Sequence, residues 1–261
     1  MKYGFIGCGN MGSAIAKALA KKTTDIIITD RSGKAMKLAQ DLGCHYSNNE
    51  TVINICERVF LAVKPQMMED VLKPLQPLLA EKKPLLISMA AGLTVERIQQ
   101  LAGTSLPVIR IMPNTPVTLG RGMTLYCHND LVAESVLNDF LQDVSGCGQW
   151  DLLDENLIDA AGVVSGCGPA YMYMFMDALA NGAAACGVDK NKALFYASEA
   201  MIGAAMMVQK THQSPEALKN AVCSPGGSTL AGVRVLDDAH FAQTIADCVK
   251  AAYKRNQELG K

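Results

Sequence analysis

The first part of the chain, up to Leu153, alternates short apolar runs with apolar residues at helical spacing. The runs predict strands at Lys2–Ile6, Asp25–Thr29, Arg58–Val63, Leu85–Met89, Val108–Met112, Met123–Cys127 and Gln149–Leu153. The helical spacing predicts helices at Asn10–Lys21, Ser32–Leu42 with Ser32 as its cap, a Pro-interrupted Gln66–Ala80, Thr94–Leu101 and Leu131–Asp143. Alternating strands and helices favour right-handed βαβ units and a parallel sheet covered on both faces.

From Asp154 onward, β-branched runs nearly vanish, and Ala, Met and Gly dominate. The pattern predicts helices at Asn156–Val164, Pro169–Cys186, Lys190–Lys210, Pro215–Val222, Ser228–Leu236 and Ala239–Glu258. We therefore expect an α/β chain of two domains. A Rossmann-type doubly wound domain would span residues 1–153, and an all-helical domain would span residues 154–261.

The predicted helix Pro169–Cys186 is apolar on nearly every face. A small helical domain has too little mass to surround such a helix alone, which predicts a homodimer whose second copy covers it. The uncharged stretch around it, from Ala160 to Met176, contains Gly166, Gly168 and Pro169. These residues leave too short a continuous segment to span a bilayer, so we expect a loop followed by a helix buried on all sides.

Composition excludes several classes of protein. With 261 residues, 49% of them hydrophobic and 19% charged, the chain is globular and not disordered. A net charge of -1 gives no basic footprint, so we expect neither a nucleic acid nor a membrane as partner. The nine cysteines form no CxxC pair and the four histidines lie far apart, which predicts reduced thiols, a cytoplasmic location and no metal. Glycines interrupt the apolar start of the chain, which argues against a signal peptide.

The segment Gly7–Gly12 matches the pattern GxGxxG between the first predicted strand and the first predicted helix. In this context, Gly7 permits the tight turn, Gly9 lets the backbone approach a pyrophosphate, and Gly12 allows close packing of the helix. The amides that open the helix, including those of Asn10 and Met11, would face the phosphates. We expect all of these residues to bind a dinucleotide.

The residues after the second predicted strand bear on which nicotinamide nucleotide binds, since this turn approaches the adenosine ribose. Asp30 would accept hydrogen bonds from the ribose of NAD, whereas Arg31 and Ser32 would hold the 2'-phosphate of NADP. We expect NADPH to be preferred, with NADH as the alternative. In a simpler interpretation, Asp30 only caps the following turn.

Two further segments follow predicted strands at the carboxyl edge of the sheet, where doubly wound folds bind their ligands. Ala62, Val63, Lys64 and Pro65 end one strand, and Asn114 stands between two prolines after another. We expect both segments to contact the cofactor. The alternatives are a solvated lysine at the first and a plain turn at the second.

Segments spread over nearly the whole chain closely resemble, in order, the motifs of the pyrroline-5-carboxylate reductase family. They are Gly9–Gly12, Ala62–Pro65, Met112–Pro116, Ser165–Tyr171 and Ser224–Thr229. The resemblance implies NAD(P)H-dependent reduction of 1-pyrroline-5-carboxylate to L-proline, the final step of proline biosynthesis. It also implies an amino-terminal Rossmann domain and a helical dimerisation domain, assembled as a homodimer or a larger assembly of dimers.

The same resemblance implies roles for individual residues of this chain. Asn48 resembles the family's contact to the cofactor ribose, and Ser228 and Thr229 would meet the substrate, although the family often has Thr or Ala where Ser228 stands. Gly226 and Gly227 precede a predicted helix, so the amides there would bind the substrate carboxylate. Thr229 would hydrogen-bond the ring nitrogen of an imine that enters already protonated. The simpler alternative is a Pro-Gly turn with a Ser helix cap.

Two other functions would also use a dinucleotide-binding domain, and the sequence argues against both. A hydroxyacid dehydrogenase of similar layout carries a lysine as acid and base where this chain has Met172, and alcohol oxidation requires such a base. A regulator that senses NAD(P) without turnover would have no need of the Ser224–Thr229 loop. Both observations favour imine reduction.

Overall fold

The computed structural model describes residues 1–259 in two compact units. The first unit comprises residues 1–167 together with the end of the last helix from Ala252, and the second comprises Gly168–Ala251. The predicted boundary after Leu153 falls where the sheet ends, ahead of this division, and the extent of each domain stays a prediction. Residues 260–261 of the predicted second domain lie outside the described residues.

An eight-stranded sheet forms the centre of the first unit, in the order β3-β2-β1-β4-β5-β6-β7-β8. The strands are β1 (Tyr3–Ile6), β2 (Ile26–Thr29), β3 (His45–Tyr46), β4 (Arg58–Leu61), β5 (Leu85–Ser88), β6 (Val108–Met112), β7 (Gly122–His128) and β8 (Gly148–Leu152). The strand order reverses on either side of β1, as in a dinucleotide-binding fold. The predicted Rossmann-type sheet is confirmed.

The sheet is mixed, which corrects the expectation of a parallel one. β7 runs antiparallel to β6, while β8 runs parallel to β7. The connection from β6 to β7 holds only the short 3-10 helix Thr115–Leu119, and a parallel neighbour would need a longer crossover. The pattern also missed the helix α3 (Asn49–Ile55) and the strand β3 before it. β3 has only two residues and both are exposed, so it gives no apolar run.

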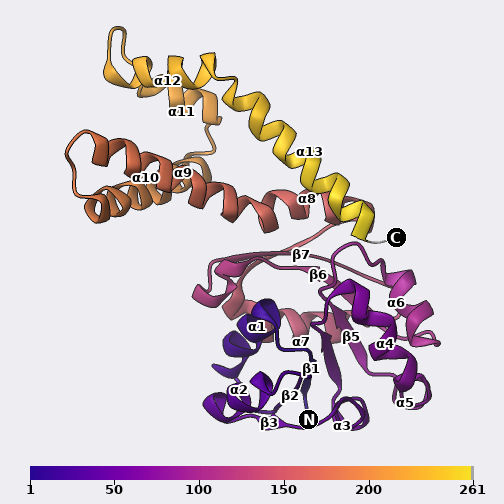
Figure 1. The fold of residues 1–261 in the computed structure, drawn as a ribbon. Helices are drawn as coiled ribbons and strands as arrows, with labels where there is room; N and C mark the ends of the chain where they lie inside the picture. The colour runs from indigo at the N-terminus through magenta and orange to yellow at the C-terminus, as the bar shows by residue number, and fades with distance from the viewer. Residues whose placement is uncertain (260–261) are drawn as a thin grey trace. The chain divides into compact units, whose positions relative to one another are not determined.

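Helices cover both faces of the sheet, and residues of its central strands enter two separate cores. Tyr3 and Phe5 of β1 belong to the core under α1 (Asn10–Ala20), α2 (Lys34–Leu42) and α7 (Glu134–Val144). Ile6 belongs to the opposite core, under α3, α4 (Met68–Leu72), α5 (Gln76–Lys82), α6 (Val95–Ala102) and α8 (Glu155–Gly162). Figure 1 shows α1 and α2 to the left of the strands and α4, α5 and α6 to the right.

Two predicted details of the helices are wrong. Gly33, in the left-handed region at φ 72°, is the N-cap residue of α2 in place of the predicted Ser32. Ser32 donates its hydroxyl to Asp30 over 2.6 Å, and its oxygen accepts the amide of Lys34, the first residue of α2, over 3.4 Å. The predicted loop before Pro169 is a π-helix over Val163–Cys167 that continues from α8 into α9 (Gly168–Ala185).

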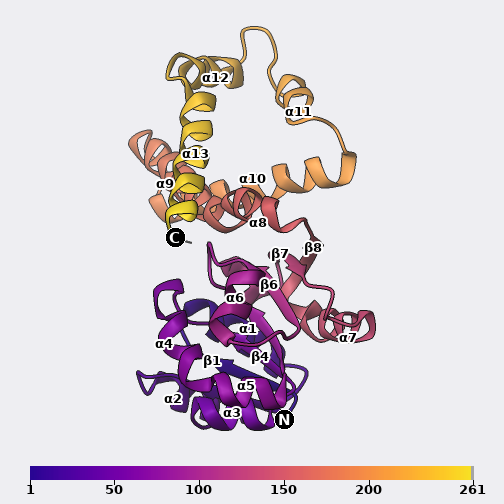
Figure 2. The same ribbon diagram turned by 90° about the vertical axis from the view of Figure 1, so that its right-hand side faces the viewer.

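The second unit is helical, as predicted, and leaves its apolar side chains largely uncovered. Its helices after α9 are α10 (Lys190–Thr211), α11 (Pro215–Ala221), α12 (Ser228–Asp238) and the larger part of α13 (Phe241–Leu259). Figure 2 shows a connection without helix between α10 and α11 and a second one between α11 and α12. Large apolar residues exposed on α9 and α10 include Met172, Tyr173, Met174, Leu179, Leu194, Phe195, Tyr196, Ile202, Met206 and Met207. Within this chain, α9 is therefore not buried on all sides.

None of the helices that the structure describes has both the length and the apolar character needed to cross a membrane.

Candidate active site

A cavity of about 690 Å³ opens in the first unit at the carboxyl edge of β1, β2 and β4. It brings together eight of the residues predicted to hold a dinucleotide. They are Gly7, Gly9, Arg31, Ser32, Asn48, Ala62, Val63 and Lys64. The first of the chain's glycine motifs, the end of the second strand and the Ala62–Pro65 segment therefore converge on one site, as their positions in the sequence predicted.

The glycines of this site are required by its geometry. Gly7 has φ 100°, and a Cβ at this position would lie 2.5 Å from the carbonyl oxygen of Ala62. A Cβ at Gly12 would lie 2.8 Å from the side chain of Ala62, so α1 packs closely on the end of β4. At Gly9, open space surrounds the position of a Cβ, which leaves the backbone accessible to a ligand.

The amino end of α1 offers donors to an anion. Gly9 is the N-cap of α1, no side chain caps the helix, and its first turn contains no acidic residue. The first helical bond that starts here runs from the Ser13 amide to the Gly9 carbonyl, over 2.9 Å. The amides before it, on Asn10, Met11 and Gly12, have no acceptor within the helix. Together with the helix dipole, these amides suit a phosphate.

The turn after β2 resolves the role of Asp30. Its carboxylate accepts the Ser32 hydroxyl at 2.6 Å and the Ser32 amide at 3.1 Å. Asp30 therefore caps the turn, as in the simpler interpretation, while it also lines the cavity. The neighbouring Arg31 is exposed and lines the same cavity.

Asn48 and Cys8 also line the cavity, and their side chains make hydrogen bonds within the protein. The side-chain oxygen of Asn48 accepts the Thr51 amide at 2.8 Å and so caps α3, which leaves the amide nitrogen of Asn48 as the donor for a ligand. Burial raises the pKa of the Cys8 thiol above its usual value, although a hydrogen bond with Ser13 opposes this shift. Nothing in this environment therefore activates the Cys8 thiol as a nucleophile.

Several predicted cofactor residues do not line the cavity. Asn10, Met11 and Gly12 follow its lining residues into α1, and Pro65 follows Lys64. Asn114 is separate, because its side chain is 8% exposed and both of its polar atoms bind within the protein.

Other residues line the cavity although the sequence analysis did not select them. Thr29, Tyr46, Met67 and Pro74 are among them. Thr29 ends the second strand, so its position at the carboxyl edge was a signal that could have identified it. Tyr46 lies in β3, which the pattern did not predict.

The predicted substrate loop, Ser224–Thr229, lies in the second unit. Gly226 has φ 74°, and the Gly227 amide donates to the Ser224 carbonyl at 2.9 Å, which closes a tight turn. Gly227 is the N-cap residue of α12 and makes no side-chain cap bond, so the Ser cap of the simpler alternative is not at this position. Ser228 and Thr229 are exposed in the first turn, where helix amides have no partner within the helix.

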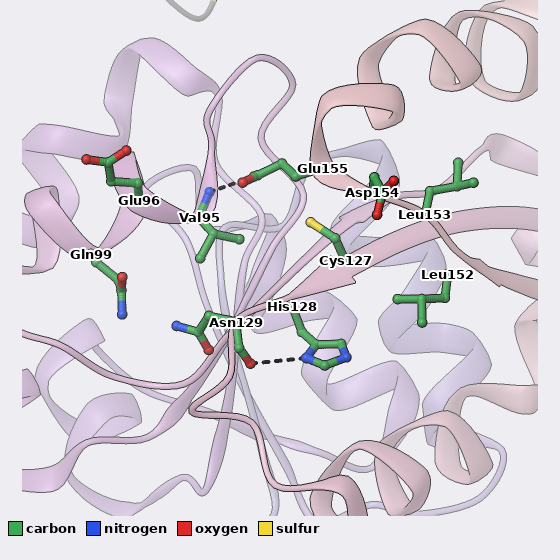
Figure 3. Close-up of a pocket in the computed structure, with 10 residues that line it drawn as sticks. All are labelled: Val95, Glu96, Gln99, Cys127, His128, Asn129, Leu152, Leu153, Asp154 and Glu155. Carbon is green, nitrogen blue, oxygen red and sulfur yellow. Dashed lines mark hydrogen bonds between the residues drawn. The ribbon is translucent and has the colours of Figure 1, made fainter.

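A second cavity, of about 580 Å³, lies between α6, the end of β7 and the start of α8. Figure 3 shows the Glu155 carboxylate reaching the Val95 amide, over 2.7 Å, and His128 beside the carbonyl of Asn129. None of the residues predicted for cofactor or substrate lines it. The glycine-rich cavity is the candidate cofactor site of the first unit, and the Ser224–Thr229 loop stays the predicted substrate site of the second unit.

Among residues 1–259, no cluster of His, Cys, Asp and Glu could hold a metal ion. All nine cysteines are free thiols.

Two family models match the chain. Residues 155–259 match "Pyrroline-5-carboxylate reductase dimerisation", and residues 2–92 match "NADP oxidoreductase coenzyme F420-dependent". Among curated proteins, the pyrroline-5-carboxylate reductase of Synechocystis is 38% identical over 100% of this chain and 99% of its own length. That of Escherichia coli is 35% identical over 100% of this chain and 98% of its own length.

Solved structures of reductases with the same name are also similar to this chain. The pyrroline carboxylate reductase of Plasmodium falciparum, with NADP bound, is 30% identical, with a TM-score of 0.90 over 100% of this chain and 98% of that one. The 1-pyrroline-5-carboxylate reductase of Streptococcus pyogenes is 32% identical, with a TM-score of 0.92 over 99% of this chain and 98% of that one.

Proposed function

This chain belongs to the pyrroline-5-carboxylate reductase family, and from that premise we propose that it reduces 1-pyrroline-5-carboxylate to L-proline with NAD(P)H, the final step of proline biosynthesis. The observation that carries the proposal is the cavity at the carboxyl edge of the sheet, where close-packed glycines and free helix amides fit a dinucleotide phosphate. The enzyme is accordingly an oxidoreductase that acts on a carbon–nitrogen double bond.

The cofactor is held by residues of the first unit. The amides of Asn10, Met11 and Gly12 bind the pyrophosphate, with Gly7 and Gly9 shaping the turn before them. Asn48, Ala62, Val63, Lys64 and Pro65 contact the ribose and the rest of the dinucleotide. Arg31 selects NADPH over NADH, because its guanidinium suits a 2'-phosphate. Ser32 supports this choice from the turn, where its hydroxyl and amide both donate to Asp30 and so engage the carboxylate that would bind the ribose of NADH.

The substrate is held by residues of the second unit. The amides that open α12, next to Gly226 and Gly227, bind the carboxylate, and the helix dipole favours its charge. Ser228 adds a hydroxyl beside them. A bound reduced nicotinamide supplies the hydride that the ring carbon of the imine accepts. The Thr229 hydroxyl oxygen accepts a hydrogen bond from the protonated ring nitrogen, so no protein acid is needed and orientation supplies most of the catalysis.

The active assembly is a homodimer, or a larger assembly of dimers, formed through the helical unit. Support comes from the dimerisation family that matches residues 155–259 and from the exposed apolar side chains of α9 and α10. Apolar area of this extent typically marks a protein interface. We keep a cytoplasmic location as a prediction, based on nine free cysteines.

A cofactor oxidation assay tests the function. Purified protein is mixed with NADPH and 1-pyrroline-5-carboxylate, and loss of the reduced nicotinamide absorbance and formation of proline are followed together. The same assay with NADH in parallel gives the cofactor preference. Binding of NADPH without turnover would favour a sensor of nucleotide, and turnover only with a hydroxyacid and NADP⁺ would favour the dehydrogenase.

A further inference from the structure

Asn114 follows β6 at the carboxyl edge of the sheet, and its side chain joins two other segments of the first unit. Its Nδ2 donates to the Ser165 carbonyl at 2.9 Å, and its Oδ1 accepts the Met123 amide of β7 at 2.9 Å. Only 8% of the residue is exposed. A buried amide with both polar atoms paired to backbone groups acts as a fixed link between the two segments.

The bond from Asn114 to Ser165 takes the place of an α-helical bond that Pro169 cannot make. Ser165 lies in the π-helix Val163–Cys167, and an α-helical carbonyl there would accept the amide four residues later. That residue is Pro169, which has no N–H. Asn114 therefore supplies a donor to a carbonyl that has no α-helical partner, and such a donor stabilises a π-turn, which is rare in helices.

A second contact fastens the same two segments. A Cβ at Gly162, the last residue of α8, would lie 2.8 Å from the side chain of Met112, the last residue of β6. The end of β6 and the turn after α8 are thus joined by close packing and by the Asn114 hydrogen bond. From this turn the chain continues directly into α9 and the second unit.

We propose that Asn114 is a positioning residue for the reduction, acting through the π-helix Val163–Cys167 and not through the cofactor. This inference rests on the proposed function. Reduction requires the nicotinamide and the imine to meet at a few ångströms, and the cofactor and substrate residues belong to different units. The π-helix is the last segment of the first unit before the substrate-binding unit, so its conformation bears on that meeting.

The test compares Asn114→Asp with a matched control, Asn129→Asp. Asn129 lies beyond the other end of β6 and makes the same kind of link: its Oδ1 accepts the Val108 amide at 3.1 Å, and its Nδ2 donates to the Leu106 carbonyl at 3.0 Å. Both substitutions keep the acceptor and remove the donor. We measure the Kd for NADPH by fluorescence, kcat and KM with 1-pyrroline-5-carboxylate, and hydrogen exchange of the amides in residues 163–170.

Asn114→Asp should lower kcat by roughly ten- to a hundredfold. Its Kd for NADPH should stay within about twofold of the wild-type value, since the cofactor keeps all its contacts. Exchange should accelerate in residues 163–170. Asn129→Asp should leave kcat, Kd and this exchange unchanged even if it lowers the melting temperature equally.

A second variant gives a rescue. Pro169→Ala restores an N–H four residues after Ser165, so Asn114→Asp combined with Pro169→Ala should recover part of kcat and of the protection from exchange. A Kd for NADPH that rises in step with the loss of kcat would make Asn114 a direct cofactor contact and overturn the proposal. An unchanged kcat would also overturn it. If the wild-type protein binds NADPH but turns over no 1-pyrroline-5-carboxylate, the proposed function fails, while the exchange data still report on the link between Asn114 and the π-helix.

Discussion

The two units of this protein contain apolar residues of the same kinds but bury them to different degrees. In the first unit, every residue of β1, β2, β4 and β5 is buried between two layers of helices. In the second unit, α9 has only Gly168 and Ala180 buried, and Met174 is 73% exposed. The difference shows that an apolar pattern indicates that a surface will be covered, without indicating which chain covers it.

The largest effect should come from a charge placed on the exposed apolar surface of the second unit. Met174→Asp would bury a carboxylate in each half of the homodimer interface, at about 3–5 kcal/mol per copy. Sedimentation at micromolar concentration should show monomers in place of dimers. Met36→Asp is the control, since Met36 is 48% exposed on α2 of the first unit and should leave the assembly intact. Dimers of the Met174 variant that remain stable on dilution would contradict the interface.

Removing a large side chain from the core of the first unit should lower the free energy of unfolding by a similar amount, whatever the state of assembly. Phe60 is fully buried, stacks on Phe5 at 4.4 Å between ring centroids and lies 6.0 Å from Phe140. Phe60→Ala should lower the free energy of unfolding by about 3–5 kcal/mol. Chemical denaturation should show this loss at every protein concentration. A loss that shrinks as concentration rises would mean that the first unit, too, depends on a partner.

A substitution in the predicted substrate loop of the second unit should change turnover without changing cofactor binding. Thr229→Ala should lower kcat by roughly ten- to a hundredfold, the value of one hydrogen bond to a charged group at about 1.5–3 kcal/mol. Thr229→Ser should recover much of the loss, and the Kd for NADPH should be unchanged in both variants. The pH profile should keep its shape. A lost limb of that profile, or complete loss of turnover, would point to proton delivery by Thr229.

A substitution in the first unit, after β2, should change the preference for NADPH over NADH. Arg31→Ala should raise the KM for NADPH by roughly 5- to 30-fold, or about 1–2 kcal/mol, and hardly change the KM for NADH, which has no 2'-phosphate. Lys37→Ala, which removes an exposed charge from α2, should change neither constant. If both constants move together for Arg31→Ala, the specificity lies with Asp30.

The smallest effect concerns an ion cluster at the amino edge of the sheet. Partial burial would by itself raise the pKa of Asp143, but hydrogen bonds from Lys2 and Tyr3 and the charge of Arg58 outweigh it and hold that pKa below its usual value. Asp143 therefore contributes stability above its unfolded pKa, and the contribution is lost as the pH falls through the folded pKa. Asp143→Asn should cost about 1–2 kcal/mol at neutral pH, and denaturation curves should converge with those of the wild type in acid. A cost independent of pH would exclude this charge contribution.

Much of the fold could be predicted because periodicity reports local burial. The strand Val108–Met112 was predicted to the residue, and the start of α12 at Ser228 was also correct. The direction of β7 was not predictable in this way, since an apolar run has the same pattern in either direction. Ser32 was a reasonable helix cap by residue type, but Asp30 two residues earlier competes for its hydroxyl.

The sequence by itself determined where the glycine-rich cavity lies, because glycine spacing and strand ends specify where backbone amides become free. It also determined that the second half is helical and apolar enough to need a cover. Only the tertiary structure decided the environment of Asn114. Its partners Met123 and Ser165 lie 9 and 51 residues away and reach it through the antiparallel return of β7 and the turn after α8. Hydrogen bonds between such segments depend on three-dimensional register, which no local pattern encodes.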